Sequence, residues 1–169
     1  MGFLPDPLHP AIIHFPIVLA LVAFLFEALA RHPRGRSLES AAVVLVVLAA
    51  LGAVAAVVTG NMAHDEAVIP AGARAILEQH EELGEQAMWV LIVLATTRVI
   101  LAWRRRFTGW LPWVYLLLAA VAAGMVSYNG RLGGEMVFDH GVGTAPVQHG
   151  WAPVSPPDAS APPRGDRHE

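Results

Sequence analysis

The chain contains neither cysteine nor lysine among its 169 residues. Without cysteine, its own residues cannot form disulfides, iron–sulfur clusters, thiolate metal sites or a covalently attached c-type haem. Charge is also scarce, because only 15% of the residues are charged and the mean hydropathy is +0.50. A soluble domain would carry charge on roughly a quarter of its residues. These deficits exclude an ordinary soluble domain, and no basic patch beyond two short loops offers a surface to nucleic acid.

Four apolar runs are each long enough to cross the hydrocarbon core of a bilayer, which takes about 20 residues. They predict membrane spans at about 10–31, 41–60, 86–104 and 110–128. The first run lacks the basic start and the cleavage site of a signal peptide. We therefore predict an all-α fold, an integral membrane four-helix bundle, over residues 1–143. Residues 144–169 are rich in proline and alanine, which predicts a disordered tail.

The charges in the connections predict the orientation of the bundle. The first connection contains Arg31, Arg34 and Arg36, and the third contains the run 104–106, which is all arginine. Arginine-rich connections are retained on the cytoplasmic side. The second connection is acidic, and good helix formers from about residue 72 predict that the third helix begins outside the membrane. Both termini are therefore expected on the outer, periplasmic side.

The histidines gather on that outer side. Seven of the eight fall there: His9, His14, His64, His80, His140, His149 and His168. Histidine is the commonest side-chain metal ligand and the side chain that titrates near neutral pH. His14 falls at the edge of the hydrocarbon, where an unpartnered polar group is costly, so it is expected to have a partner. The pattern indicates a metal site, a haem site or a proton site.

Two opposite charges lie inside the spans. Glu27 is the only charge well inside the first span, and Arg98 is the only one inside the third. We predict that they form a structural ion pair between these helices. His9 precedes Glu27 by the same interval as His80 precedes Arg98, and this interval is about five helical turns. The pairing would therefore set His9 and His80 at similar depth, with His14 a little deeper.

A glycine-rich segment, NGRLGGEMVFDHGVGT, follows the fourth span at residues 129–144. Glycine allows positive φ and a close approach of backbones. We expect this segment to fold back over the mouth of the bundle and to carry His140 towards the other histidines. It is no phosphate-binding loop, because it lacks a preceding strand and the Lys-Ser/Thr pair.

The motif HPAIIHFP near the N-terminus, a histidine opening the third helix and GRLGGEMVFDHGVG after the fourth span together resemble the bacterial membrane family catalogued as domain of unknown function 2231. The resemblance covers about residues 5–144 and implies a four-helix domain of the bacterial inner membrane with no settled activity. Some members of that family are fused to redox domains of the Rieske type. Its motif histidines fall on His9, His14 and His80, while His64 is less clearly part of the shared pattern.

Three functions remain open from the sequence. The first is an electron-transfer subunit that binds haem b through His80 and either His14 or His9, with a methionine as the alternative axial ligand (Met62, Met125 or Met136). The second is a copper, zinc or iron site at the outer face, whose candidate ligands are His9, His64, His80 and His140, supported by Asp65 or Glu81. The third is a cofactor-free scaffold or assembly subunit. The expected partners are the lipid bilayer and a membrane or periplasmic redox protein. The sequence shows no nucleophile–base pair at a usable spacing, so a redox or structural subunit is favoured over an enzyme.

Overall fold

The computed structural model describes residues 9–66 and 69–142. Over these residues the chain forms helices and no strand. Four spans are long and apolar enough to cross a membrane, which confirms the all-α, four-helix fold class. In chain order the elements are α1 (His9–Ile12), α2 (His14–Ala30), η1 (Pro33–Leu38), α3 (Glu39–Glu66), η2 (Ala71–Ala73), α4 (Arg74–Trp103) and α5 (Leu111–Phe138).

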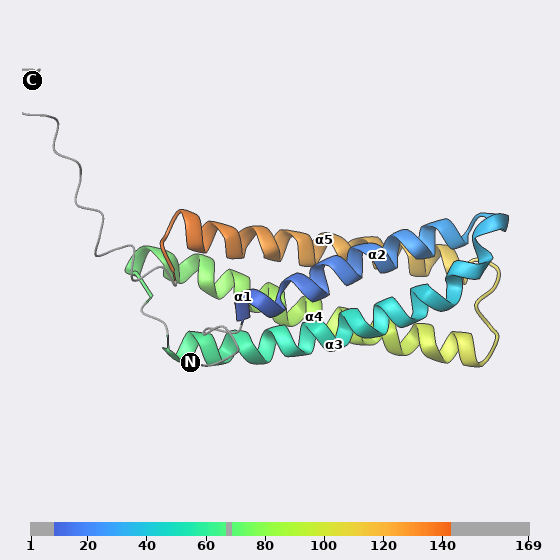
Figure 1. The fold of residues 1–169 in the computed structure, drawn as a ribbon, viewed down its shortest axis with the longest axis horizontal. Helices are drawn as coiled ribbons and strands as arrows, with labels where there is room; N and C mark the ends of the chain where they lie inside the picture. The colour runs from blue at the N-terminus through green and yellow to red at the C-terminus, as the bar shows by residue number, and fades with distance from the viewer. Residues whose placement is uncertain (1–8, 67–68, 143–169) are drawn as a thin grey trace, which may run out of the picture.

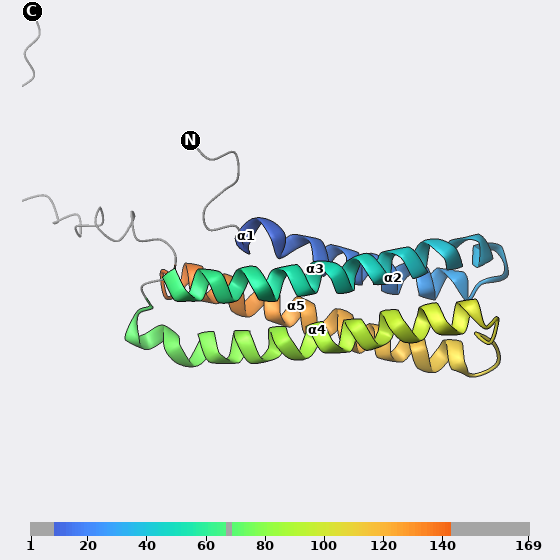
Figure 2. The same ribbon diagram turned by 90° about the horizontal axis from the view of Figure 1, so that it is seen from below.

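The four long helices run alternately up and down along one axis (Figures 1 and 2). α2 packs on α3 and on α5, and α4 packs on the same two helices. The first and third spans are therefore diagonal to each other across the bundle. Short connections between successive helices favour this arrangement of antiparallel neighbours.

The core is built largely from alanine. Its buried residues include Ala20, Ala23, Ala49, Ala50, Ala53, Ala87, Ala95, Ala119 and Ala122. Small side chains allow membrane helices to approach closely, because lipid gives no hydrophobic drive for helices to associate. Many of the large apolar side chains instead point outward, for example Leu51, Val93 and Leu117. This distribution is typical of a bundle that is solvated by lipid.

The glycine-rich segment differs from the prediction. Helix α5 continues through it to Phe138, so residues 129–138 do not fold back over the bundle as expected. Glycine here serves the packing of helices: a Cβ atom on Gly130 would lie 3.0 Å from Ile17 Cδ1 of α2. The chain turns only at Gly141, which has a φ of 67°. The expectation failed because glycine permits close helix packing as well as turns.

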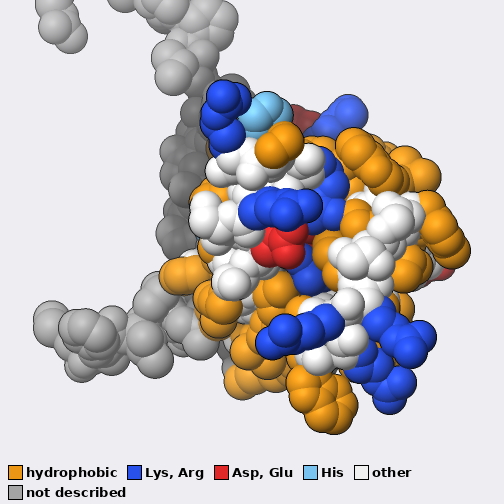
Figure 3. All heavy atoms as spheres, turned by 90° about the vertical axis from the view of Figure 1, so that its right-hand side faces the viewer, with side chains coloured by type: hydrophobic (Ala, Val, Ile, Leu, Met, Phe, Trp, Pro, Cys, Tyr) orange, Lys and Arg blue, Asp and Glu red, His pale blue; other side chains and the backbone are white. Residues whose placement is uncertain are grey.

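The two ends of the bundle differ in charge. Figure 3 views the end that carries η1 and the connection between α4 and α5, where several arginine side chains gather. In this connection Arg105 adopts a φ of 50°, and Trp103 and Trp110 at its flanks are strongly exposed. Exposed tryptophan beside arginine is typical of the boundary between lipid and water.

Candidate functional site

A cavity of about 270 Å³ opens at the other end of the bundle. There α1 begins well inside the end that α3, α4 and α5 reach (Figures 1 and 2). All four spans line the cavity, and most of the lining is apolar. Its polar side chains include His9, His64, His80, Glu81 and Asn129. The cavity thus places imidazoles from three helices in one apolar chamber.

His9 and His80 face each other inside this cavity. Their ring centroids are 6.4 Å apart and their planes are nearly perpendicular, at 89°. They come from the first and third spans, which lie diagonally across the bundle. Both rings are half-buried. The structure therefore brings together the two histidines that were expected to share a depth from their equal spacing to Glu27 and to Arg98.

In both rings Nδ1 is the nitrogen that contacts another group of the protein. The Nδ1 of His80 lies 3.1 Å from the carbonyl oxygen of Asn129, which can only accept, so Nδ1 carries the proton. The Nδ1 of His9 lies 3.3 Å from the Thr59 hydroxyl oxygen. That hydroxyl has two backbone carbonyls to donate to, Ala55 O at 2.8 Å and Ala56 O at 3.2 Å, and its oxygen accepts from His9 when the His9 proton is on Nδ1. In each neutral ring Nε2 is then the bare nitrogen that a ligand can use.

A glycine of the neighbouring helix makes room for each imidazole. A Cβ atom on Gly60 of α3 would lie 3.1 Å from Cε1 of His9, and one on Gly133 of α5 would lie 3.3 Å from Cε1 of His80. Such contacts are tighter than ordinary van der Waals packing, so a larger residue would displace the rings. The two glycines thus form notches in which the imidazoles sit.

His64 lies in the lining of the same cavity. Its Nδ1 pairs with Glu81 Oε1, linking the end of α3 to the start of α4. Both side chains remain more than one-third exposed. His64 therefore binds a carboxylate partner, and the contact between imidazole rings in the cavity is that of His9 with His80. The sequence placed His64 and Glu81 at the same outer face, but it did not predict this direct pair, since the two residues belong to different helices.

The other candidate histidines lie outside the cavity lining. His14 is exposed, and its Nδ1 donates to Pro10 O at 2.8 Å in its own helical turn. His140 follows the end of α5 and is partly exposed, whereas Val142 beyond the turn lines the cavity. Neither joins His80 in the chamber. The tail 144–169, with His149 and His168, lies outside the described residues.

Of the candidate methionine ligands, one lines the cavity and two do not. Met136 is buried and lines the cavity, while Met62 is 62% exposed and Met125 packs on the core away from it. The side chain of Asp65 lies outside the described residues. Within the part of the chain that the structure describes, no group of three or more His, Asp or Glu residues is arranged to hold a metal ion.

The second polar cluster lies at the arginine end. Glu27 and Arg98 are almost fully buried and form an ion pair, in which Arg98 Nε donates to Glu27 Oε1. Arg31 binds the other carboxylate oxygen at 3.2 Å. The ring of Phe107 covers Arg98, 3.8 Å from its guanidinium carbon. Arg31 and Phe107 were not predicted as members of this cluster, although the four-residue spacing of Glu27 and Arg31 is a recognised helical pair.

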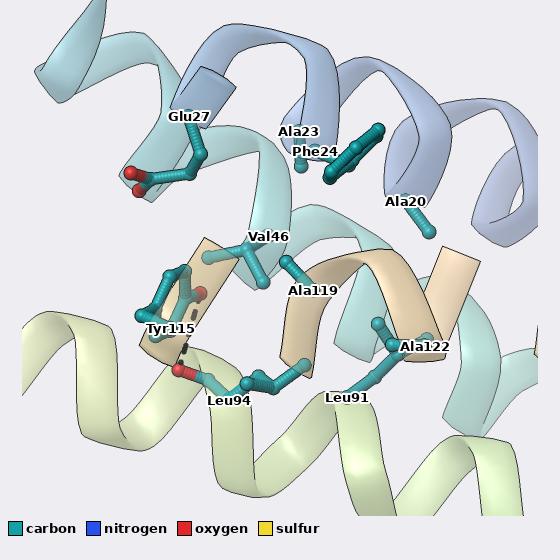
Figure 4. Close-up of a pocket in the computed structure, with 10 residues that line it drawn as sticks. All are labelled: Ala20, Ala23, Phe24, Glu27, Val46, Leu91, Leu94, Tyr115, Ala119 and Ala122. Atoms are coloured by element: carbon teal, nitrogen blue, oxygen red, sulfur yellow. Dashed lines mark hydrogen bonds between the residues drawn. The ribbon is translucent and has the colours of Figure 1, made fainter. Parts of the chain in front are cut away.

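A very small apolar space, of about 10 Å³, separates this cluster from the middle of the bundle. Glu27 of α2 and Tyr115 of the neighbouring α5 line it, and several alanines complete the wall (Figure 4). The Tyr115 hydroxyl donates to Leu94 O at 3.5 Å. The space has about the volume of one water molecule, so no larger ligand fits there.

These features define a four-span helical membrane protein with a histidine-lined cavity at one end and a buried ion cluster at the other. The chain belongs to the family described as "Predicted membrane protein (DUF2231)", which it matches over residues 5–146. This match confirms the family resemblance seen in the end motifs. No curated protein and no solved structure matches the chain.

Proposed function

We propose that this protein is an electron-transfer subunit of the bacterial inner membrane and that it binds b-type haem through His9 and His80. The observation that carries the proposal is the pair of imidazoles, 6.4 Å apart across the bundle, each with Nδ1 bound to a protein oxygen. Two imidazoles on one haem iron have ring centres about 6 Å apart, because each iron–nitrogen bond is about 2 Å long.

The donor set suits haem in three further respects. Haem iron takes four nitrogens from the porphyrin, so one or two protein ligands suffice, and His9 with His80 supplies two. A ligating imidazole commonly donates its second N–H to a protein oxygen, as both rings do here. The apolar lining, which includes Met88 and Met136, suits the faces of a macrocycle. The cavity of about 270 Å³ is slightly smaller than the range of about 300–1,000 Å³ for small-molecule sites, so haem would also extend out of its open side.

The chain's own residues have separate tasks in this proposal. When bound, haem would supply one-electron redox chemistry. His9 and His80 would hold it through Nε2, while Thr59 and the Asn129 carbonyl orient the rings and increase their basicity. The apolar wall would keep water from the centre. His64 with Glu81 would bind the α3 and α4 ends together beside the cavity.

The orientation of the chain is part of the proposal. With the arginine end on the cytoplasmic side, both termini lie outside and the cavity opens at the periplasmic surface. An electron partner would then be a membrane or periplasmic redox protein that approaches this end. Four apolar spans support residence in a lipid bilayer.

The test is an absorption spectrum of protein purified gently from its native membrane, before and after reduction with dithionite. We expect a reduced α-band that is lost in His9→Ala and in His80→Ala. His14→Ala is the matched control and should keep the band, since His14 lies outside the cavity lining. A protein without the band overturns the haem proposal. Elemental analysis then separates a bare metal site, with one transition ion per chain, from the scaffold function.

A further inference from the structure

We propose that Thr59 is the positioning residue for His9: its hydroxyl oxygen accepts the Nδ1 proton and so holds the ring as the Nδ1–H tautomer. The bare Nε2 is then fixed as the nitrogen offered to a ligand. The proposal deepens the proposed function, on which its statement about haem rests. Its central claim concerns a tautomer of the free protein and can be measured without haem.

The contacts of Thr59 distinguish this role from ordinary helix packing. A threonine inside a helix commonly donates to the carbonyl four residues earlier, and Thr59 does so to Ala55 O. Its oxygen has a further contact, to His9 Nδ1 at 3.3 Å, across 50 residues of sequence. The next residue, Gly60, gives the same ring room to lie against α3. Successive residues of α3 thus supply the hydrogen-bond acceptor and the notch.

The two imidazoles are oriented by different means. His80 is held by the backbone carbonyl of Asn129, which no substitution removes. His9 has the Thr59 hydroxyl as a side-chain partner besides the backbone of Ala56, so the side-chain contribution can be removed by one methyl-for-hydroxyl exchange. Thr59→Val keeps the shape and removes the acceptor, while Thr59→Ser keeps the hydroxyl. These two variants separate the hydrogen bond from the packing.

The chain also contains a matched control for the back-bonded hydroxyl. Ser127 in α5 donates to Ala123 O at 2.7 Å, four residues earlier, as Thr59 does to Ala55 O. Ser127 is exposed and lies outside the cavity lining. Ser127→Ala therefore removes the same kind of helix contact without touching an imidazole.

The primary measurement is the nitrogen-15 spectrum of the histidine side chains in the full-length, haem-free protein in detergent at alkaline pH, with His9 assigned by its loss in His9→Gln. We expect Nδ1–H for His9 in the wild type, in Thr59→Ser and in Ser127→Ala. Thr59→Val should shift His9 towards the Nε2–H tautomer. If His9 is the Nε2–H tautomer in the wild type, or stays Nδ1–H in Thr59→Val, the proposal is overturned. Where Thr59→Val fails to fold, an Nε2–H tautomer in the wild type still overturns the proposal, and Thr59→Ala then serves as the second variant that removes the acceptor.

The second measurement is haem retention by the same variants. Loss of an orienting partner commonly lowers the affinity of a metal ligand set by about 10- to 100-fold. We expect a loss of this size in Thr59→Val and near-normal retention in Thr59→Ser. Haem that binds equally to both variants contradicts the role of Thr59 and leaves the proposed function intact. A wild type that binds no haem but holds His9 as Nδ1–H contradicts the proposed function and leaves the positioning role intact.

Discussion

Removing Glu27 should destabilise the bundle more than removing Arg98 does. The reason is that Glu27 is shared: it binds Arg98 through one carboxylate oxygen and Arg31 through the other. Glu27→Gln keeps the volume but leaves two guanidinium groups facing each other, one of them 2% exposed. Arg98→Met instead leaves Glu27 paired with Arg31. The first change strands charge in the interior, whereas the second removes one cation and leaves a neutral pair.

The magnitudes follow from the burial of the cluster. Breaking a buried ion pair by removing one partner typically costs about 3–5 kcal/mol, which we expect for Glu27→Gln. For Arg98→Met we expect about 1–2 kcal/mol, because an apolar side chain of similar length replaces an ion whose partner keeps a second cation. In the double variant only Arg31 remains, and its side chain reaches solvent at 11% exposure. The double variant should therefore cost less than the sum of the singles by about 2 kcal/mol.

The assay is reversible unfolding of the full-length protein in mixed detergent micelles, followed by tryptophan fluorescence and circular dichroism. The exposed Arg36→Gln at the same end is the control and should change the unfolding free energy by no more than about 0.5 kcal/mol. The reasoning is refuted if Arg98→Met costs as much as Glu27→Gln. Strictly additive effects in the double variant would also refute it, because they would mean that the two residues do not interact.

Three other results are expected. Gly60→Ala should destabilise the bundle and disturb His9, since its Cβ would lie 3.1 Å from that ring, whereas Gly124→Ala, with open space around it, should be neutral or stabilise by up to about 1 kcal/mol in the same unfolding assay. Phe107→Leu should cost about 1–2 kcal/mol through its lost contact with the buried Arg98, and an unchanged unfolding curve would contradict that contact. Compartment-specific reporters fused at residue 35 and after residue 142 should report cytoplasm and periplasm respectively, and a cytoplasmic signal at the second position would overturn the orientation.

The sequence predicted the membrane fold because the hydrocarbon core imposes a length and an apolar composition on each span. It also predicted that the third helix begins near residue 72, well before its apolar run, and α4 does begin at Arg74. It failed for residues 129–138, where glycine looked like a breaker. The notches that Gly60 and Gly133 provide depend on which neighbouring helix approaches them. That information is not contained in the local pattern of a single segment.

The candidate site was only partly predictable for a similar reason. A count of histidines on one side of the membrane does not distinguish His9 from His14, because it ignores the direction in which each side chain leaves the helix. On one continuous helix these two directions differ by about 140°. In the structure His14 points outward to its own Pro10 carbonyl, while His9 lines the cavity. The partners that orient His9 and His80, a hydroxyl and a backbone carbonyl, carry no signal in the sequence.

The two polar clusters are related by helix geometry. Glu27 and Arg98 are paired across the diagonal of the bundle. His9 lies in the same span as Glu27 and His80 in the same helix as Arg98, and each histidine is separated from its charged residue by the same interval. That interval is about five turns, or about 27 Å, so residues at this spacing recur on the same face. A slip of α2 against α4 would break the ion pair and separate the imidazoles at once. A buried ion pair is weak evidence for stability in itself, but it is costly to misalign. We therefore interpret the Glu27–Arg98 pair as the contact that fixes the register of the first and third spans, and the facing imidazoles as the feature that this register produces.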